Sequence, residues 1–133
     1  MVATHAANAY ARIGLETGVA AASPQRLIVM LYDGAIAALN EARVHMAHGR
    51  TAQKGQAIGK AIAIVDEGLK AALDTSKGGA IAGQLMELYD YISRRLLVAN
   101  LRDDPALVEE GARLLAELRG AWAALAERQA VPA

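Results

Sequence analysis

The chain of 133 residues contains no cysteine and no phenylalanine, and its single tryptophan is Trp122. Without cysteine, a disulfide framework, a thiolate nucleophile and a zinc–thiolate site are all excluded. The absence also fits a reducing cytosol. An excess of charge is lacking as well, because 14 basic residues balance 14 acidic ones. A neutral chain without a long basic run is a poor candidate for binding nucleic acid or an anionic membrane.

Long apolar runs and targeting signals are missing too. No stretch of about 18 uninterrupted apolar residues occurs, so we expect no membrane span. The chain opens with small, mixed residues instead of a basic segment followed by an apolar one, which argues against a secretion signal. Its length suits one domain that buries roughly two thirds of the surface of the unfolded chain.

What the sequence does contain is helical periodicity in four segments. Apolar residues recur at alternating steps of three and four, the spacing of helices that pack in a bundle. The pairs Ser23-Pro24 and Asp104-Pro105 each join a capping side chain to a proline, which is typical of a helix start. No segment alternates with the period of two that a strand would show.

These features predict an all-α fold, an antiparallel up-down four-helix bundle over residues 23–128. Residues 1–22 are expected to form an N-terminal leader, part helical or a partly ordered tail, and residues 129–133 a short C-terminal tail. The spacing assigns core faces to the four helices in turn. They hold, among others, Ile28, Tyr32, Ala35, Leu39, Ala42 and Met46; Ile58, Ile62, Val65, Leu69 and Leu73; Ile81, Leu85, Leu88, Ile92, Leu96 and Ala99; Leu107, Gly111, Leu114, Leu118 and Ala121.

Two adjacent arginines, Arg94 and Arg95, interrupt the apolar run of the third helix. At about 100° per residue they fall on its outer side. Asp90 precedes Arg94 by four residues, which predicts an ion pair within the helix. The favoured interpretation is a solvated face, and a partner contact through Arg95 stays open as the alternative.

Patterns that carry chemistry are weak. His45 and His48 share a helix face, but no carboxylate accompanies them at a matching step, so no metal site is predicted. The loop 74–79 holds lysine, serine and glycine in an order that does not make a phosphate loop. We therefore predict no catalytic, cofactor-binding or metal-binding residue, and no enzyme.

The informative signal is a surplus of apolar residues outside the core stripes. On the second helix, a further stripe of small residues contains Ile64. A bundle needs about one apolar face per helix. The surplus favours a groove for a partner segment, although wide buried faces would also account for it. The residues expected to contact a partner are Tyr10, Ile13, Ile36, Ile64, Tyr91, Leu97 and Leu101, with Arg95 as a polar contact at the rim.

The chain resembles the FliS family of flagellar secretion chaperones. The resemblance extends from about Tyr10 to residue 125 and rests on short motifs in a specific order. They include Tyr10-Ala11, Ala22–Ile28 (ASPQRLI), Met30–Ala35 (MLYDGA), Lys54-Gly55, Leu88–Tyr91 (LYDY), Arg94–Leu97 (RRLL), Ala99–Arg102 (ANLR) and Trp122.

The resemblance implies a cytoplasmic, non-enzymatic export chaperone with a helical bundle fold. Such a protein binds the disordered C-terminal segment of flagellin, most simply one-to-one, keeps flagellin from polymerising and assists its delivery to the flagellar export machinery. The family places its leader near the partner surface, and its tyrosine matches Tyr10. The alternative is a structural bundle that associates with itself through the same apolar strips and has no client.

Overall fold

The structure is a computed structural model that describes residues 23–73 and 75–130. The leader 1–22, with the predicted contacts Tyr10 and Ile13, lies outside the described residues. In chain order the elements are α2 (Pro24–Ala47), α3 (Thr51–Ala63), the π-helix η2 (Ile64–Leu69), α4 (Lys70–Ala72), α5 (Thr75–Arg102) and α6 (Pro105–Ala130).

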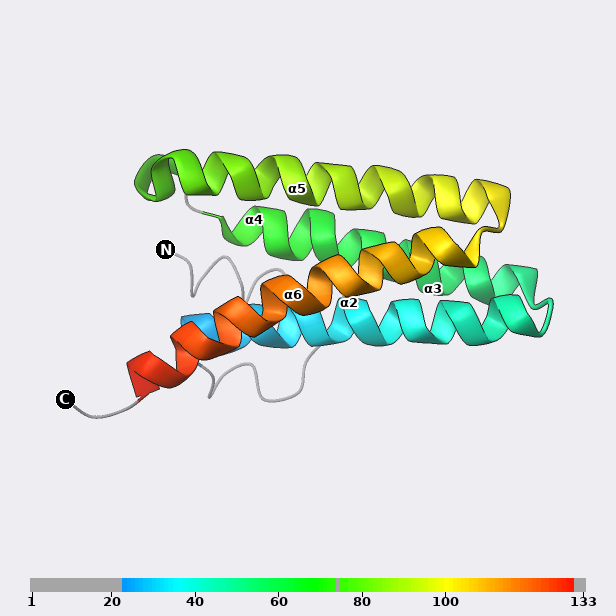
Figure 1. Cartoon of the computed structure of the whole chain (residues 1–133), viewed down its shortest axis with the longest axis horizontal. Coiled ribbons are helices and arrows are strands. Elements are labelled where there is room, and N and C mark those ends of the chain that lie inside the picture. The colour runs from blue at the N-terminus through cyan, green and yellow to red at the C-terminus, as the bar shows by residue number, and fades with distance from the viewer. Residues whose placement is uncertain (1–22, 74, 131–133) are drawn as a thin grey trace.

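These elements form an antiparallel helical bundle. The segments α3, η2 and α4 follow one another without a break and make one continuous rod, so the described residues form four rods (Figure 1). Each rod returns along the previous one, and α6 crosses obliquely over α2. The predicted all-α four-helix bundle is therefore confirmed. Helix α6 continues to Ala130, past the predicted end at residue 128.

Two helix starts follow the predicted capping chemistry. The Ser23 side chain accepts a hydrogen bond from the backbone amide of Arg26, 3.1 Å away, and α2 begins at Pro24. The side chain of Asp104 likewise accepts from the amide of Ala106 at 3.0 Å, just before the first turns of α6. These side chains satisfy amides that a helix start leaves without a carbonyl partner.

The four rods are arranged as a ring in which α2 and α5 are diagonal partners. Helix α2 packs against α3 and α6, and α5 packs against the same two helices. Across the diagonal, the buried rings of Tyr32 and Tyr89 meet, and their hydroxyl oxygens lie 2.5 Å apart. Because burial disfavours a charged phenolate, it raises the pKa of both tyrosines.

The predicted core faces are right for α2 and for the second rod, and they need correction in α5 and α6. Of the six residues predicted for α2, five are buried and Met46 is partly buried against the core. In α5, however, Ile81 is 69% exposed, while Ala82 and Tyr89 are buried. In α6, Ala121 is exposed, and Val108 and Leu115 are buried instead. A helix with apolar residues at every third and fourth step offers two neighbouring stripes, and the packing of its neighbours selects between them.

The stripe of small residues on the second rod lies inside the bundle. Ala57, Ala61 and Ile64 are buried, and a Cβ added to Gly68 would lie only 2.9 Å from Cδ2 of Leu31. Small residues do permit a close approach here, but the approaching helix is α2 of the same chain. The π-helix also changes the number of residues per turn. Helix faces assigned at 100° per residue therefore become inaccurate along this rod.

Candidate partner-binding surface

Helix α5 carries exposed apolar side chains on the face turned away from the core. Tyr91 is 37% exposed, Leu97 52% and Leu101 85%. Together with the half-buried Val98 they form what we call the α5 outer strip. Their spacing brings them to one side of the helix, as the sequence predicted. Exposed apolar side chains grouped on one face are typical of a protein-binding surface.

One end of the α5 outer strip is held by polar contacts to α6. The guanidinium Nε of Arg95 lies 3.0 Å from Oε1 of Glu110, and the Tyr91 hydroxyl donates to the same oxygen at 3.3 Å. The Arg95 guanidinium also lies 5.9 Å from the centre of the Tyr91 ring. Hydrogen bonding to Arg95 lowers the pKa of Glu110. Arg95 is thus at the rim of the strip, and its acceptor Glu110 was not predicted.

The two neighbouring arginines have different surroundings. Asp90 was expected to pair with Arg94, but its Oδ1 lies 2.5 Å from Nζ of Lys70 on α4. That hydrogen bond raises the pKa of Lys70. The prediction was wrong because a lysine on the adjacent rod comes closer than the arginine one turn away. Arg94 is exposed beside the strip, and Arg102 is exposed at its C-terminal end.

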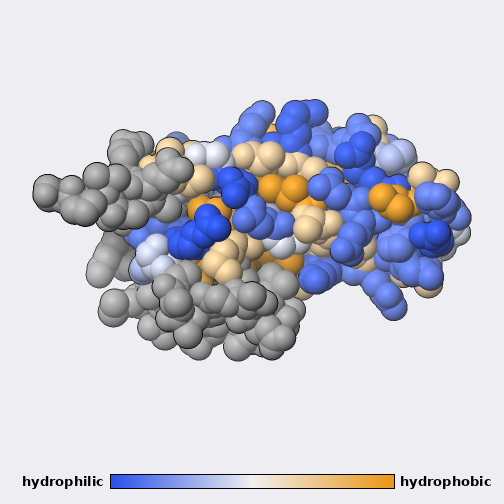
Figure 2. Space-filling view, turned by 90° about the horizontal axis from the view of Figure 1, so that it is seen from below, coloured by the Kyte–Doolittle hydropathy of each residue, from blue (hydrophilic) through white to orange (hydrophobic). Residues whose placement is uncertain are grey.

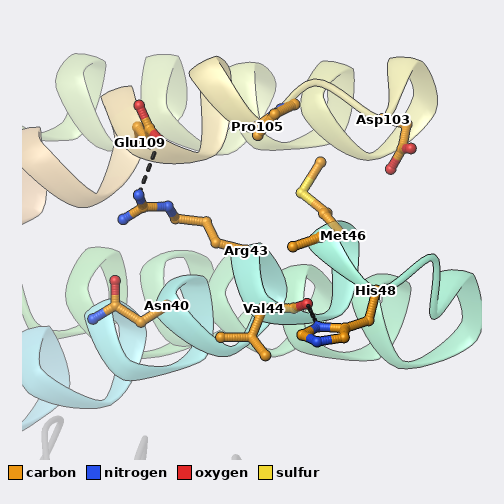
Figure 3. Close-up of a pocket in the computed structure, with 9 residues that line it drawn as sticks. Asn40, Arg43, Val44, Met46, His48, Asp103, Pro105 and Glu109 are labelled. Carbon is orange, nitrogen blue, oxygen red and sulfur yellow. Dashed lines mark hydrogen bonds and ion pairs between the residues drawn. The ribbon is translucent and has the colours of Figure 1, made fainter.

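A second surface feature is an end groove of about 760 Å³ between the last turns of α2 and the start of α6. Val44, Met46 and His48 form one side, and Asp103 and Pro105 form the other (Figure 3). An ion pair between Arg43 and Glu109, 2.9 Å long, crosses the groove.

On the underside of the bundle, apolar residues gather in a band near the middle and in a separate spot toward one end (Figure 2). Hydrophilic residues surround both. The underside therefore presents apolar surface in separate places, and Val44, at the end groove, is 52% exposed.

The structure separates the predicted contact residues into groups. Tyr91, Leu97 and Leu101 lie on the exposed side of α5, and Arg95 lies at the edge of that side next to α6. Ile36 lies on the diagonal helix α2, partly buried against the core. Ile64 has no exposed surface and belongs to the hydrophobic core, so it cannot form part of a surface strip in this arrangement.

Several polar side chains near these surfaces are engaged in contacts within the bundle. His48 Nδ1 lies 2.9 Å from the carbonyl oxygen of Val44, and Ser93 donates to Asp66 at 2.7 Å. Asp33 pairs with Arg119 of α6. Within the described ranges, no group of three or more histidine and acidic side chains is placed to hold a metal ion. None of the helices there is long and apolar enough to cross a membrane.

Fold and surface together define a helical bundle that displays apolar side chains on a face outside its core. The family model described as "Flagellar protein FliS" matches residues 6–129. The chain therefore belongs to the FliS family.

Curated relatives have the same family name. The flagellar secretion chaperone FliS of Salmonella typhimurium (strain LT2) is 53% identical over 86% of this chain and 84% of its own length. FliS of Escherichia coli (strain K12) is 41% identical over 92% of this chain and 90% of its own. The secretion chaperone FliSB of Pseudomonas aeruginosa is 40% identical over 92% and 96%. These relatives are chaperones, which agrees with the resemblance seen in the motifs.

Proposed function

We propose that this protein is a cytoplasmic, non-enzymatic chaperone that binds the disordered C-terminal segment of flagellin. It prevents premature polymerisation and assists delivery of flagellin to the export apparatus. The observation that supports this proposal most directly is membership of a family of secretion chaperones, combined with exposed apolar residues on α5. A disordered client loses conformational entropy when it becomes ordered, so it needs a large apolar footprint to bind usefully.

The positions of the apolar surfaces favour a client that wraps around the bundle. The α5 outer strip and Ile36 lie on diagonal helices, with α3 and α6 between them. A single straight helix on one face cannot touch both. An extended segment of about 40 residues can span the bundle, since an extended chain covers about 3.3 Å per residue. One client per bundle follows, because one segment would occupy both surfaces.

The electrostatics of the strip favour particular client sequences. Glu110 neutralises Arg95, and Lys70 neutralises Asp90, whereas Arg94 and Arg102 are exposed near the strip. A client helix with acidic residues beside its apolar face is therefore expected to associate faster, with a rate that falls as salt increases.

Calorimetric titration with the C-terminal ~40 residues of flagellin from the same organism tests the proposal. We expect saturable one-to-one heat and a negative heat-capacity change. The double variant Leu97→Ser/Leu101→Ser should weaken binding by about a hundredfold or more, because each fully buried leucine contributes about 1.5–3 kcal/mol and about 1.4 kcal/mol is tenfold. Ile81→Ser is the matched control, since Ile81 is similarly exposed near the other end of α5.

Two outcomes would contradict the proposal. The first is an absence of heat at several temperatures with folded protein. The second is an oligomer that persists on dilution and does not exchange with the flagellin segment, which would favour the self-associating structural bundle. If binding occurs but the two leucine changes leave it intact, the chaperone function stands and the α5 outer strip is excluded as its site.

A further inference from the structure

Lys54, in the second turn of α3, is a buried charged residue. Its side chain is 6% exposed. The amine Nζ donates to the backbone carbonyl of Asn100 at 3.0 Å and lies 3.3 Å from Oδ1 of Asp103. Burying an ammonium group is costly unless it is paired and hydrogen-bonded. Both of these contacts are made to one place, the corner where α5 ends.

The end of a helix at this corner presents groups that a lysine amine can bind. The last carbonyls of a helix have no partner within the helix, and the negative end of its dipole attracts a cation. At the end of α5, the amide of Asp104 donates to the carbonyl of Ala99 at 3.0 Å. The carbonyl of Asn100 accepts a long bond of 3.4 Å from the amide of Asp103 and the shorter one from Lys54. Asp103 has a φ of 51°, in the left-handed region that most side chains avoid. Its carboxylate faces Lys54, which favours this conformation.

Lys54 also belongs to the other corner at this end of the bundle. Its backbone amide donates to the carbonyl of Arg50 at 2.9 Å, just after the turn that joins α2 to α3. One side of the end groove lies in the last turns of α2, before this turn, and the other includes Asp103 (Figure 3). Lys54 is therefore a direct link between the α2–α3 corner and the α5–α6 corner.

We infer that Lys54 is a positioning residue for client binding. Its amine fixes the α5–α6 corner and thereby holds the last turns of α5, with Leu97 and Leu101, in the geometry that the client meets. The client part of this inference rests on the proposed function, whereas the corner itself can be tested without a client. A surface that is already ordered before binding loses less entropy when the client arrives.

The absence of cysteine from the chain makes a sharp test available. In Lys54→Cys the new thiol is unique, so it can be alkylated in denaturant and the protein refolded. Aminoethylation restores an amine on a chain of lysine length, whereas ethylation gives a similar apolar chain without the amine. The pair separates the charged hydrogen-bonding group from the volume of the side chain. Lys60→Cys, at an exposed position on the same helix, carries both modifications as the control.

The first readout is amide hydrogen exchange in the refolded proteins. We expect the amides of Asp103 and Asp104 to exchange about tenfold faster or more in the ethylated Lys54→Cys protein, and at the wild-type rate in the aminoethylated one. The amide of Arg26, bonded to Ser23 at the opposite end of the bundle, should be unchanged throughout. Equal protection at the corner in both modified proteins would overturn the inference.

The second readout is affinity for the flagellin segment under conditions where every variant is folded. Under these conditions a loss of stability alone does not alter the affinity. An affinity that falls about tenfold in the ethylated protein and is restored by aminoethylation would therefore show that the amine positions the binding surface. Unchanged affinity would remove the client part of the inference. If the wild-type protein does not bind the segment, the proposed function fails, and hydrogen exchange still decides the role of Lys54.

A milder variant covers the case in which the ethylated protein does not refold. Asp103→Asn keeps a residue that tolerates the left-handed conformation and removes only the charge that faces Lys54. Because the bond to the Asn100 carbonyl remains, we expect a smaller rise in exchange, confined to the corner. Wild-type exchange at the corner in Asp103→Asn would show that the ion pair has no part in fixing it.

Discussion

The buried hydroxyl pair of Tyr32 and Tyr89 allows a quantitative test of the core. The two oxygens lie 2.5 Å apart between diagonal helices, and the side chains are 0% and 1% exposed. Replacing either tyrosine by phenylalanine removes one hydroxyl and leaves the other buried with its main partner lost. An unsatisfied buried hydroxyl costs about 1–3 kcal/mol, so each single variant should lose that much stability.

The double variant should behave differently. With both hydroxyls removed, no buried hydroxyl is left without its partner, and two phenylalanine rings fill nearly the same volume. Trp122, which also bonds Tyr32, is only half-buried, so its indole N–H can bond water instead. We expect Tyr32→Phe/Tyr89→Phe to cost only about 0–1 kcal/mol. The two single losses sum to about 2–6 kcal/mol. The double-mutant cycle should therefore give a coupling of about 1–6 kcal/mol, above the roughly 0.3–0.5 kcal/mol within which distant, independent sites add.

Urea unfolding at pH 7, followed by helical circular dichroism, measures all four proteins. The m value is the slope of the free energy of unfolding against urea concentration. Equal m values across the set would show that the variants expose the same surface on unfolding. The reasoning is refuted if the double variant loses the sum of the two single losses. That result would mean that each hydroxyl contributes separately and that their contact has no energetic weight.

Three further predictions concern pH and packing. Burial raises the pKa of both core tyrosines, so their contribution to the free energy of unfolding is complete below the unfolded pKa of about 10 and is lost as pH rises above it. In the double phenylalanine variant, the free energy of unfolding should therefore fall less steeply with pH in the alkaline range. Gly68→Ala should lose about 1–3 kcal/mol through the contact with Leu31, whereas Gly59→Ala, with open space around it, should gain about 0.5–1 kcal/mol in urea unfolding. Carbon-detected NMR titration should place the pKa of Glu110 below its usual value, and Arg95→Gln should raise it; an unchanged titration would exclude the ion pair in solution.

Much of the fold and part of the candidate site could be predicted from sequence. The caps at Ser23 and Asp104, and the core face of α2, depend on residues close together in the chain, so local patterns suffice. The exposed position of Leu97 and Leu101 also followed from helical spacing. The burial of Ile81 and Ile64 was predicted wrongly, because it depends on residues that are far apart in the chain. Each lies on one of two neighbouring apolar stripes of its helix, and only the packing of neighbouring helices decides which stripe is buried.

Sequence alone was enough for the number and direction of the helices and for the family, because periodicity, caps and ordered motifs are properties of the chain itself. The motifs around Lys54 and Asn100 were visible there, but their contact was not. Charged groups pair with whatever lies within about 4 Å, and at that range electrostatic energy changes steeply with distance. The partners of Lys54, Arg95 and Asp90 were therefore decided only when tertiary packing brought the helices together.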